Sequence, residues 1–303
     1  MNKKLLRFLS CIFIIYTSCD SKFKDFEAQI DWQSFYFKSD TVAGRYLEKY
    51  AMIVPVTIEK DTSVYEMQFD TGANMTEFYE NPIREIKSIA SKIDTFNVNQ
   101  YSVALNLTLD EFQSQVKAFP IRKGFGIKNS KHIGTIGANE FENKILIIDY
   151  PRQKFAILDS LQLRFKKDFE FSDFEDPEGQ IYLKLKMNNK IYNFLFDTGS
   201  STTPLITNMT LYKELTGKTK QNIDTIRASS WGVEVIAPGA KNIYPIYVGD
   251  LKLKSDLRVY GTDAKHTIEF LKTNKLDGLI SNPYFFQDVV LIDFKNKKFG
   301  VRK

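Results

Sequence analysis

Hydrophobic residues along this chain alternate with polar ones or gather in short apolar runs, and both patterns are typical of β-strands. Corresponding pairs of strands are predicted in the two halves, at Val54–Ile58 with Val64–Phe69 and at Ile181–Leu185 with Ile191–Phe196. The second pair is joined through Asn188 and Asn189, which tolerate the positive φ of a tight turn. Short helices are predicted at Pro82–Ile93 and at about Thr210–Thr216, before the stop signal Gly217. We therefore expect a mainly β protein with a few short helices.

The chain contains an internal repeat. Phe69-Asp70-Thr71-Gly72 recurs as Phe196-Asp197-Thr198-Gly199 at an offset of 127 positions. Near the end of each half the offset is 144, where Gly134–Phe141 aligns with Gly278–Phe285 and Ile147–Tyr150 with Leu291–Phe294. The difference predicts an insertion in surface loops of the second half, where added length costs little. We expect two related lobes, at residues 46–160 and 161–303.

Two segments stand outside this repeat. Asp173–Gly179 combines charge, Pro and Gly, and is predicted to link the halves. Residues 19–45 have no partner in the repeat. They are expected to be a lipid-anchor tether or another N-terminal extension, and an added strand and an inhibitory pro-segment both remain open.

The first 18 residues read as a signal peptide. Basic residues precede an apolar run, Leu5–Tyr16, that is too short for a lasting membrane span. The run ends in Tyr16-Thr17-Ser18-Cys19, which resembles the lipobox of bacterial lipoproteins except that Tyr stands where an aliphatic residue is usual. We expect lipidation of Cys19 and attachment to a membrane of the bacterial envelope, at the outer membrane or the periplasmic face. An ordinary signal peptide and a short uncleaved anchor are the alternatives.

Charge and cysteine content exclude several classes of function. The net charge is +5, but Lys3, Lys4 and Arg7 lie in the leader and no basic stripe follows, so no nucleic-acid partner is expected. Cys11 also lies in the leader, so a mature chain would hold neither a disulfide nor a thiol beyond Cys19. A Cys–His nucleophile is thereby excluded. The only histidines, His132 and His266, are too few for a zinc site, so both are read as surface residues and no metal or cofactor is expected.

The repeated aspartates are the candidate chemical groups. If the two halves place Asp70 opposite Asp197, each carboxylate has a like charge beside it, and one of them stays protonated over a wide pH range. One group can then accept a proton from water while the other donates to a carbonyl oxygen. Asp149 and Asp293 are also repeated, but each follows an apolar run, so we interpret them as turn formers at strand ends.

These motifs resemble the aspartic peptidases of the pepsin and retropepsin group. Residues 70–73 are closer to the retropepsin form, residues 197–200 to the pepsin form, and residues 135–139 are similar to the retropepsin segment that threads behind the acidic loop. The resemblance covers roughly residues 46–303. It implies two β-barrel-like lobes related by a pseudo-twofold axis, with a cleft between them and a hairpin flap that closes over an extended peptide.

The resemblance also implies roles for particular residues. Asp70 and Asp197 would be the catalytic pair, supported by Thr71, Gly72, Thr198, Gly199 and Ser200. Candidates for the flap are Tyr101 and, at the tip of a hairpin of the second lobe, Trp231. Two positions depart from the pattern, since Ala73 lacks a hydroxyl and Ser281 stands where Gly is expected behind Asp197.

The sequence therefore predicts an aspartic endopeptidase on a lipid-anchored envelope protein, acting on peptides or proteins. Both lobes lie in one chain, so a monomer is expected. The alternative is a non-catalytic binding lipoprotein that holds a peptide or another ligand in the interlobe cleft.

Overall fold

The computed structural model describes residues 30–58, 61–94, 101–109, 112–113, 117–217, 224–230, 233–253 and 257–302. The signal peptide, Cys19 and Trp231 lie outside the described residues. Among the residues that are described, no helix combines the length and the apolar character needed to cross a membrane.

Short strands dominate the N-terminal half, and the few helices are single turns. The strands are β1 (Gln33–Ser34), β2 (Tyr36–Val42), β3 (Arg45–Ile58), β4 (Tyr65–Phe69), β5 (Glu77–Tyr79), β6 (Ile93–Asp94), β7 (Ser102–Leu105), β8 (Leu107–Leu109), β9 (Phe112–Gln113), β10 (Lys117–Arg122), β11 (His132–Ile136), β12 (Ile145–Asp149) and β13 (Lys154–Leu158). The helices are α2 (Glu80–Ile83), α3 (Lys87–Ala90) and the 3-10 helix η1 (Ala138–Phe141).

The C-terminal half is built in the same way. Its strands are β14 (Phe169–Glu175), β15 (Tyr182–Met187), β16 (Lys190–Asp197), β17 (Leu205–Asn208), β18 (Asp224–Ser230), β19 (Val233–Lys241), β20 (Tyr247–Val248), β21 (Leu251–Lys252), β22 (Arg258–Thr262), β23 (Gly278–Ser281), β24 (Val289–Asp293) and β25 (Lys298–Arg302). Its helices are α5 (Met209–Leu215), α6 (Lys265–Thr273) and the 3-10 helices η2 (Pro177–Gly179) and η3 (Asn282–Tyr284), and α4 (Leu163–Lys166) precedes β14.

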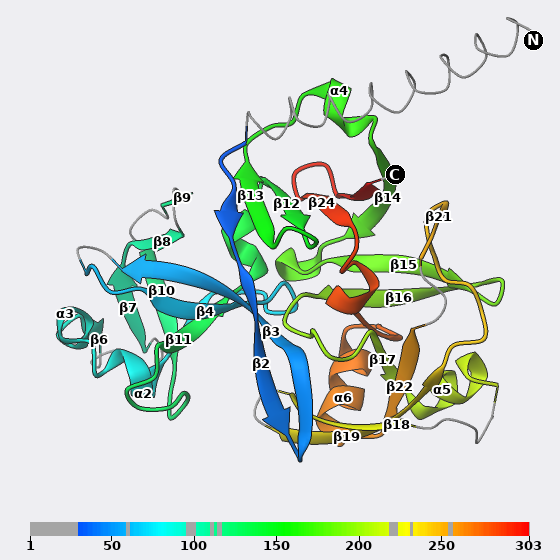
Figure 1. Ribbon diagram of the computed structural model, residues 1–303, viewed down its shortest axis with the longest axis horizontal. Helices are drawn as coiled ribbons and strands as arrows, with labels where there is room; N and C mark the ends of the chain where they lie inside the picture. The colour runs from blue at the N-terminus through cyan, green and yellow to red at the C-terminus, as the bar shows by residue number, and fades with distance from the viewer. Residues whose placement is uncertain are drawn as a thin grey trace, which may run out of the picture.

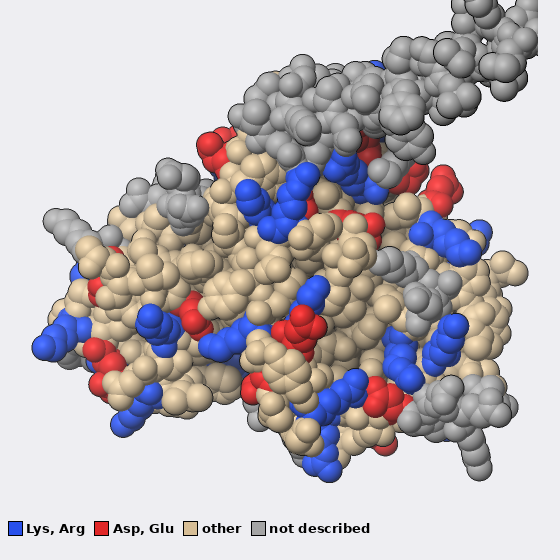
Figure 2. Space-filling model, viewed as in Figure 1, with Lys and Arg blue, Asp and Glu red and all other residues tan. Residues whose placement is uncertain are grey.

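The strands form two lobes on either side of a shared central sheet (Figure 1). One lobe has the strand order β6-β7-β10-β5-β11-β4-β3-β8-β9, and the other continues from β14 through β15, β16, β23, β17 and β22 to β19 and β18. The central strands run in the order β1-β13-β12-β24-β25-β14, so each half contributes three of them. The expected mainly β, bilobal architecture is confirmed. On the face drawn in Figure 2, Lys and Arg side chains are interspersed with Asp and Glu.

The pairing of β12 with β24 shows where the pseudo-twofold axis that relates the two lobes lies. The two strands are antiparallel, and Ile147 pairs with Leu291, its own counterpart in the repeat. Ile145 pairs with Asp293 and Asp149 with Val289, symmetrically on either side. A residue that pairs with its own counterpart can do so only where the axis passes, so the axis runs through the middle of the central sheet.

The N-terminal lobe begins earlier than the repeat indicated. β1 pairs with β13 at Phe155, and β14 pairs with β25 at Phe299, the counterpart of Phe155. Of the alternatives left open for residues 19–45, the structure shows added strands, since β2 pairs with β3 and β1 is the structural counterpart of β14. Its pairing is made by the backbone, which leaves no sequence signature. Asp173–Gly179 is likewise not the link, because it contains the end of β14, and residues 159–168 connect the halves instead.

A duplicated aromatic cluster supports the strand that leads into each acidic segment. Phe69 packs against Phe141 and Phe155, with ring centroids 5.2 and 5.3 Å apart. Its counterpart Phe196 packs against Phe285 and Phe299, the counterparts of those rings, at 5.4 and 5.2 Å. All six rings are buried. The same three-ring core therefore fixes the end of β4 and of β16.

The local predictions have mixed outcomes. α5 forms where expected, with the Asn208 side chain accepting from the Thr210 and Leu211 amides at 3.0 and 2.9 Å and Gly217 at φ +68° after its end. The β15–β16 turn has positive φ at Asn188 and Asn189, as predicted. The helix predicted at Pro82–Ile93 is wrong, because Ile86 is extended and divides the segment into α2 and α3.

Candidate active site

Each acidic segment begins at the end of a strand that is paired with a neighbouring strand on both sides. Asp70 follows β4, which lies between β3 and the parallel strand β11, and its amide donates to the Ile136 carbonyl at 3.0 Å. Asp197 ends β16, which lies between β15 and the parallel strand β23, in register with Ser281. The two segments that the repeat aligned at offset 144 thus lie directly beside the two acids.

Thr71 and Thr198 hold the two segments together through four hydrogen bonds. The Thr71 amide donates to Thr198 Oγ1 at 2.9 Å, and the Thr198 amide donates to Thr71 Oγ1 at 3.2 Å. The hydroxyls donate in turn across the axis, from Thr71 to the Phe196 carbonyl at 2.9 Å and from Thr198 to the Phe69 carbonyl at 3.0 Å. Both threonines are fully buried. The structure brings them together as the resemblance implied.

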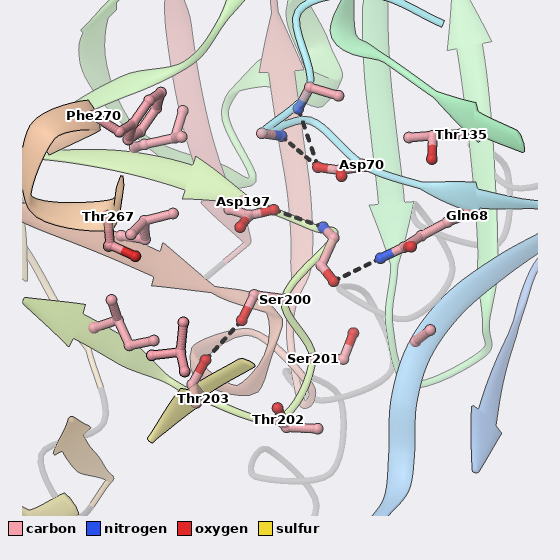
Figure 3. A pocket seen from close by; sticks show the side chains of 18 of the residues that line it. Gln68, Asp70, Thr135, Asp197, Ser200, Ser201, Thr202, Thr203, Thr267 and Phe270 are labelled. Atoms are coloured by element: carbon pink, nitrogen blue, oxygen red, sulfur yellow. Dashed lines mark hydrogen bonds between the residues drawn. The ribbon is translucent and has the colours of Figure 1, made fainter. Parts of the chain in front are cut away.

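Asp70 and Asp197 line one cavity of about 300 Å³ together with side chains of both lobes (Figure 3). The two carboxyl groups lie close together, because a single Cβ placed on Gly72 would come within 2.7 Å of Asp197 Oδ1 and 3.1 Å of Asp70 Oδ1. Both side chains are half-buried, so they are reached from the cavity and otherwise enclosed by protein. A cavity of this size suits a small number of substrate side chains.

The surroundings of the two acids are similar but not identical. Asp70 Oδ1 accepts from the amides of Gly72 and Ala73 at 2.9 and 3.1 Å, and Asp197 Oδ1 accepts from the Gly199 amide at 2.8 Å. Burial raises the pKa of Asp70 above its ordinary value, while the hydrogen bond from Asp197 and those from the amides oppose the shift. Burial, and then the charge of Asp70, raise the pKa of Asp197 well above its ordinary value. The pair therefore holds a proton readily.

Gly72 and Gly199 leave room for the carboxyl of the opposite lobe. A Cβ on Gly72 would lie 2.7 Å from Asp197 Oδ1, and a Cβ on Gly199 would lie 2.4 Å from Asp70 Cγ. Neither glycine has a positive φ, so close approach rather than backbone freedom requires glycine here. The sequence identified the residues but not this reason.

The two departures from the family pattern fit the structure. Ala73 contributes its amide to Asp70, which needs no hydroxyl. Ser281 is buried and extended, with φ −136° and ψ 176°, and its amide donates to the Pro204 carbonyl at 3.0 Å. Gly137 in the other lobe has no such freedom, because a Cβ there would lie 2.3 Å from the Met75 carbonyl carbon. Ser200 supports Asp197 through its amide, while its hydroxyl bonds Thr203 Oγ1 at 2.7 Å.

Two glutamines that the sequence analysis missed connect each acidic segment to the opposite lobe. Gln68 Nε2 donates to the Gly199 carbonyl at 2.8 Å (Figure 3), and Gln180 Nε2 donates to the Gly72 carbonyl. The two are not counterparts in the repeat, because Leu195 stands where Gln68 would recur. No spacing rule singled them out, because Gln68 lies within β4 and Gln180 lies between η2 and β15.

The two walls of the cavity differ in character. On the N-terminal side, Arg122 donates to Glu77 at 3.1 Å and its guanidinium lies 3.9 Å from the centroid of the Phe125 ring. Tyr79 lies beside them, with its hydroxyl 2.7 Å from Thr135 Oγ1. The C-terminal wall combines apolar side chains with hydroxyl groups, from Leu195, Ile206, Val235, Phe270 and Leu279 and from Ser200, Ser201, Thr202, Thr203, Thr262 and Thr267. Apart from Asp197, this wall is uncharged, whereas the N-terminal wall is charged and aromatic.

Tyr101 does not line this cavity. Its hydroxyl donates to Glu80 at 2.8 Å and bonds Arg84, beside α2. The second flap candidate, Trp231, lies between β18 and β19, outside the described residues, although Val235 of β19 lines the cavity.

Other polar residues have structural roles. Asp149 Oδ1 and Asp293 Oδ1 accept from the amides three residues on, at 3.1 and 2.9 Å, which confirms them as turn formers. His132 and His266 were both expected at the surface, but both are half-buried. His266 lies on α6, and His132 packs against the Tyr79 ring, where burial lowers its pKa. Within the described part of the chain, no group of three His, Cys, Asp or Glu side chains is placed to hold a metal ion.

Comparison with solved structures finds the same architecture in an aspartic proteinase. The crystal structure of aspartic proteinase from Irpex lacteus superposes with a TM-score of 0.52, covering 90% of this chain and 96% of that one. The sequence identity is 10%, so the likeness shows a shared fold. No family model matches the sequence. No curated protein matches it either.

Proposed function

We propose that this chain is an aspartic endopeptidase that hydrolyses peptide bonds with water activated by Asp70 and Asp197. One observation carries the proposal: two acids from the two halves meet in one interlobe cavity, each against the glycine of the opposite acidic segment and with a raised pKa. The fold shared with an aspartic proteinase supports it, although fold alone does not determine activity.

The proposed mechanism follows from one proton held by two neighbouring acids. We assign the ionised form to Asp70, which accepts a proton from water as the water oxygen attacks the peptide carbonyl carbon. Asp197 donates its proton to the carbonyl oxygen, which gives a neutral tetrahedral diol. Asp70 then passes its proton to the amide nitrogen as the C–N bond breaks. Asp197 recovers a proton from the diol as the new carboxyl group forms, and the pair returns to its starting state.

The test is cleavage of a diverse peptide mixture by residues 20–303 between pH 3 and 8, read by mass spectrometry. Asp70→Asn and Asp197→Asn should each abolish cleavage, because Asn keeps the shape of the side chain but cannot share a proton. Asp149→Asn is a matched control, since it is also a repeated acid after an apolar strand, and Asn still accepts from the Arg152 amide. Full cleavage by either site variant would exclude the mechanism. A wild-type chain that binds peptides without cutting them would favour the alternative of a binding lipoprotein.

We also propose, from the leader alone, that Cys19 is acylated and anchors the protein to a membrane of the cell envelope. Metabolic labelling with a fatty-acid analogue should mark the wild-type protein and leave Cys19→Ser unmarked. Equal labelling of both would exclude acylation at Cys19.

A further inference from the structure

The β2–β3 hairpin extends beyond the N-terminal lobe as a two-stranded ribbon. β4 pairs with β3 only over Ile53–Val56, whereas β2 pairs with β3 from Arg45 to Ile53. In Figure 1 the ribbon, in dark blue, runs down from the lobe and ends beside β18 and β19. An isolated two-stranded ribbon is marginally stable, so its position depends on what it contacts.

The ribbon contacts the C-terminal half at both ends. At the tip, Arg45 Nη1 donates to both carboxylate oxygens of Asp224, at 2.8 and 3.0 Å, at the start of β18. Near the base, the Phe37 ring lies 5.1 Å from the Phe286 ring, and Lys49 Nζ lies 4.2 Å from the centroid of Phe286. The ribbon therefore crosses from one lobe to the other.

The part of the ribbon near its base forms part of the cavity. Tyr50 and Ala51 of β3 line it together with Asp70 and Asp197. Between the pairs Lys38–Ala51 and Asp40–Leu47, three residues of β3, including Tyr50, oppose one residue of β2. Such irregularities bend a strand and redirect a side chain, and they are common next to active sites.

The contact at the tip is suited to opening. The Arg45 side chain is 49% exposed and that of Asp224 is 28% exposed, and exposed ion pairs add little stability and weaken with salt. The turn itself is well formed, with Ala43 and Gly44 at φ +50° and +80°, a conformation that matches the twist of a tight hairpin. The ribbon can therefore move as a unit while its turn stays intact.

We propose that the β2–β3 hairpin is the lid of the interlobe cleft, closed by Arg45 on Asp224, with Tyr50 as the residue that positions the peptide. The lid opens at the tip to admit an extended peptide and closes with Tyr50 against it. The identity of the ligand rests on the proposed peptidase function, but the opening motion does not. The hairpin thus takes the place that the resemblance gave to a flap around Tyr101, which does not line the cavity.

The test uses residues 20–303 with Arg45→Glu, Asp224→Arg and the double exchange. Amide hydrogen exchange over residues 36–52 should be about two- to fivefold faster in each single variant and return to the wild-type rate in the double exchange. Lys184→Glu, which breaks the exposed Lys184–Glu175 pair, is the matched control and should leave these residues unchanged.

Peptide hydrolysis distinguishes a hairpin that opens and closes from one that only connects the two lobes rigidly. We expect KM to rise about two- to fivefold in the single variants with kcat within about twofold of wild type, and the double exchange to restore KM. KM of the wild type should rise with ionic strength, while KM of the single variants should not. Tyr50→Ala should raise KM without changing exchange at the tip.

The outcomes are distinguishable. Unchanged hydrogen exchange in Arg45→Glu would refute the proposal that the hairpin is a lid. Faster exchange with the same KM and salt dependence as the wild type would refute it too. A wild-type chain that cleaves no peptide would instead refute the proposed function, and hydrogen exchange in the single variants and the double exchange, at low and high salt, would still decide whether the hairpin opens.

Discussion

Gly199 lies against the carboxyl group of Asp70, so that a methyl group on this glycine would come within 2.4 Å of Asp70 Cγ and 2.5 Å of Oδ2. Gly72 stands in the same relation to Asp197. The glycine of each acidic segment thus makes room for the acid of the other lobe, and the two segments fit together only because both are glycine.

Gly199→Ala should therefore reduce kcat/KM for a peptide substrate at least about a hundredfold, because a displacement of roughly 1 Å at reacting groups has an effect of that order. Gly179→Ala is the control, since a Cβ there meets no atom within 4 Å and its φ of +85° makes the strain local. Circular dichroism checks that both variants fold. Wild-type kinetics in a folded Gly199→Ala variant would show that the two acids need not meet.

Thr71 and Thr198 should contribute to stability as a pair. Thr71→Val keeps the shape of the side chain but removes the hydroxyl that donates to the Phe196 carbonyl and accepts from the Thr198 amide. Leaving such buried groups unpaired costs about 1–3 kcal/mol in the free energy of unfolding, measured by denaturant titration. Thr71→Ser, which keeps the hydroxyl, should lose much less.

Because the four bonds form one network, the double variant Thr71→Val/Thr198→Val should be less destabilised than the sum of the two single variants. Strict additivity would mean that the two threonines act independently.

Much of the fold could be predicted from the sequence because the duplication preserved the side chains that pack in the core of each half. Phe141 and Phe285 were aligned from sequence, and in the structure they make the same contact with Phe69 and Phe196. The pairing of Ile147 with Leu291 also follows once the offset of 144 is known. β1 could not be found in this way, because its pairing with β13 uses backbone groups that any residue possesses.

The two acids of the candidate site could be predicted from the sequence, but the residues that hold them in place could not. Asp70 and Asp197 were found because their motif is repeated, whereas Gln68 and Gln180 act across the axis from positions that are not counterparts. Tyr50 was missed for a different reason. Its place in the cavity depends on a ribbon that leaves its own lobe, and a local pattern does not report where such a ribbon docks.

Gln68→Leu should weaken the contact between the lobes. The substitution copies Leu195, the counterpart of Gln68, and removes the donor to the Gly199 carbonyl. We expect a loss of about 1 kcal/mol in unfolding free energy, the usual net value of one hydrogen bond, together with lower kcat/KM. Gln180→Leu removes the corresponding donor to Gly72 and should behave similarly. A stable, fully active Gln68→Leu would show that this bond does not position the acid.

The raised pKa of Asp197 predicts a pH-dependent gain in stability for Asp197→Asn. In the folded protein burial and the charge of Asp70 raise this pKa well above the ordinary value of 3.8, so the folded state binds a proton more tightly than the unfolded state. The favourable contribution of the protonated group is therefore complete below about pH 3.8 and is lost as the pH rises through the folded-state pKa.

Asn carries no charge at any pH and avoids that loss. The difference in melting temperature between Asp197→Asn and wild type should thus grow from acid toward pH 8, and Asp149→Asn should show no comparable growth, because its pKa is raised less strongly. A difference that stayed constant from pH 3 to 8 would mean that Asp197 is ionised in the folded protein as readily as in the unfolded chain.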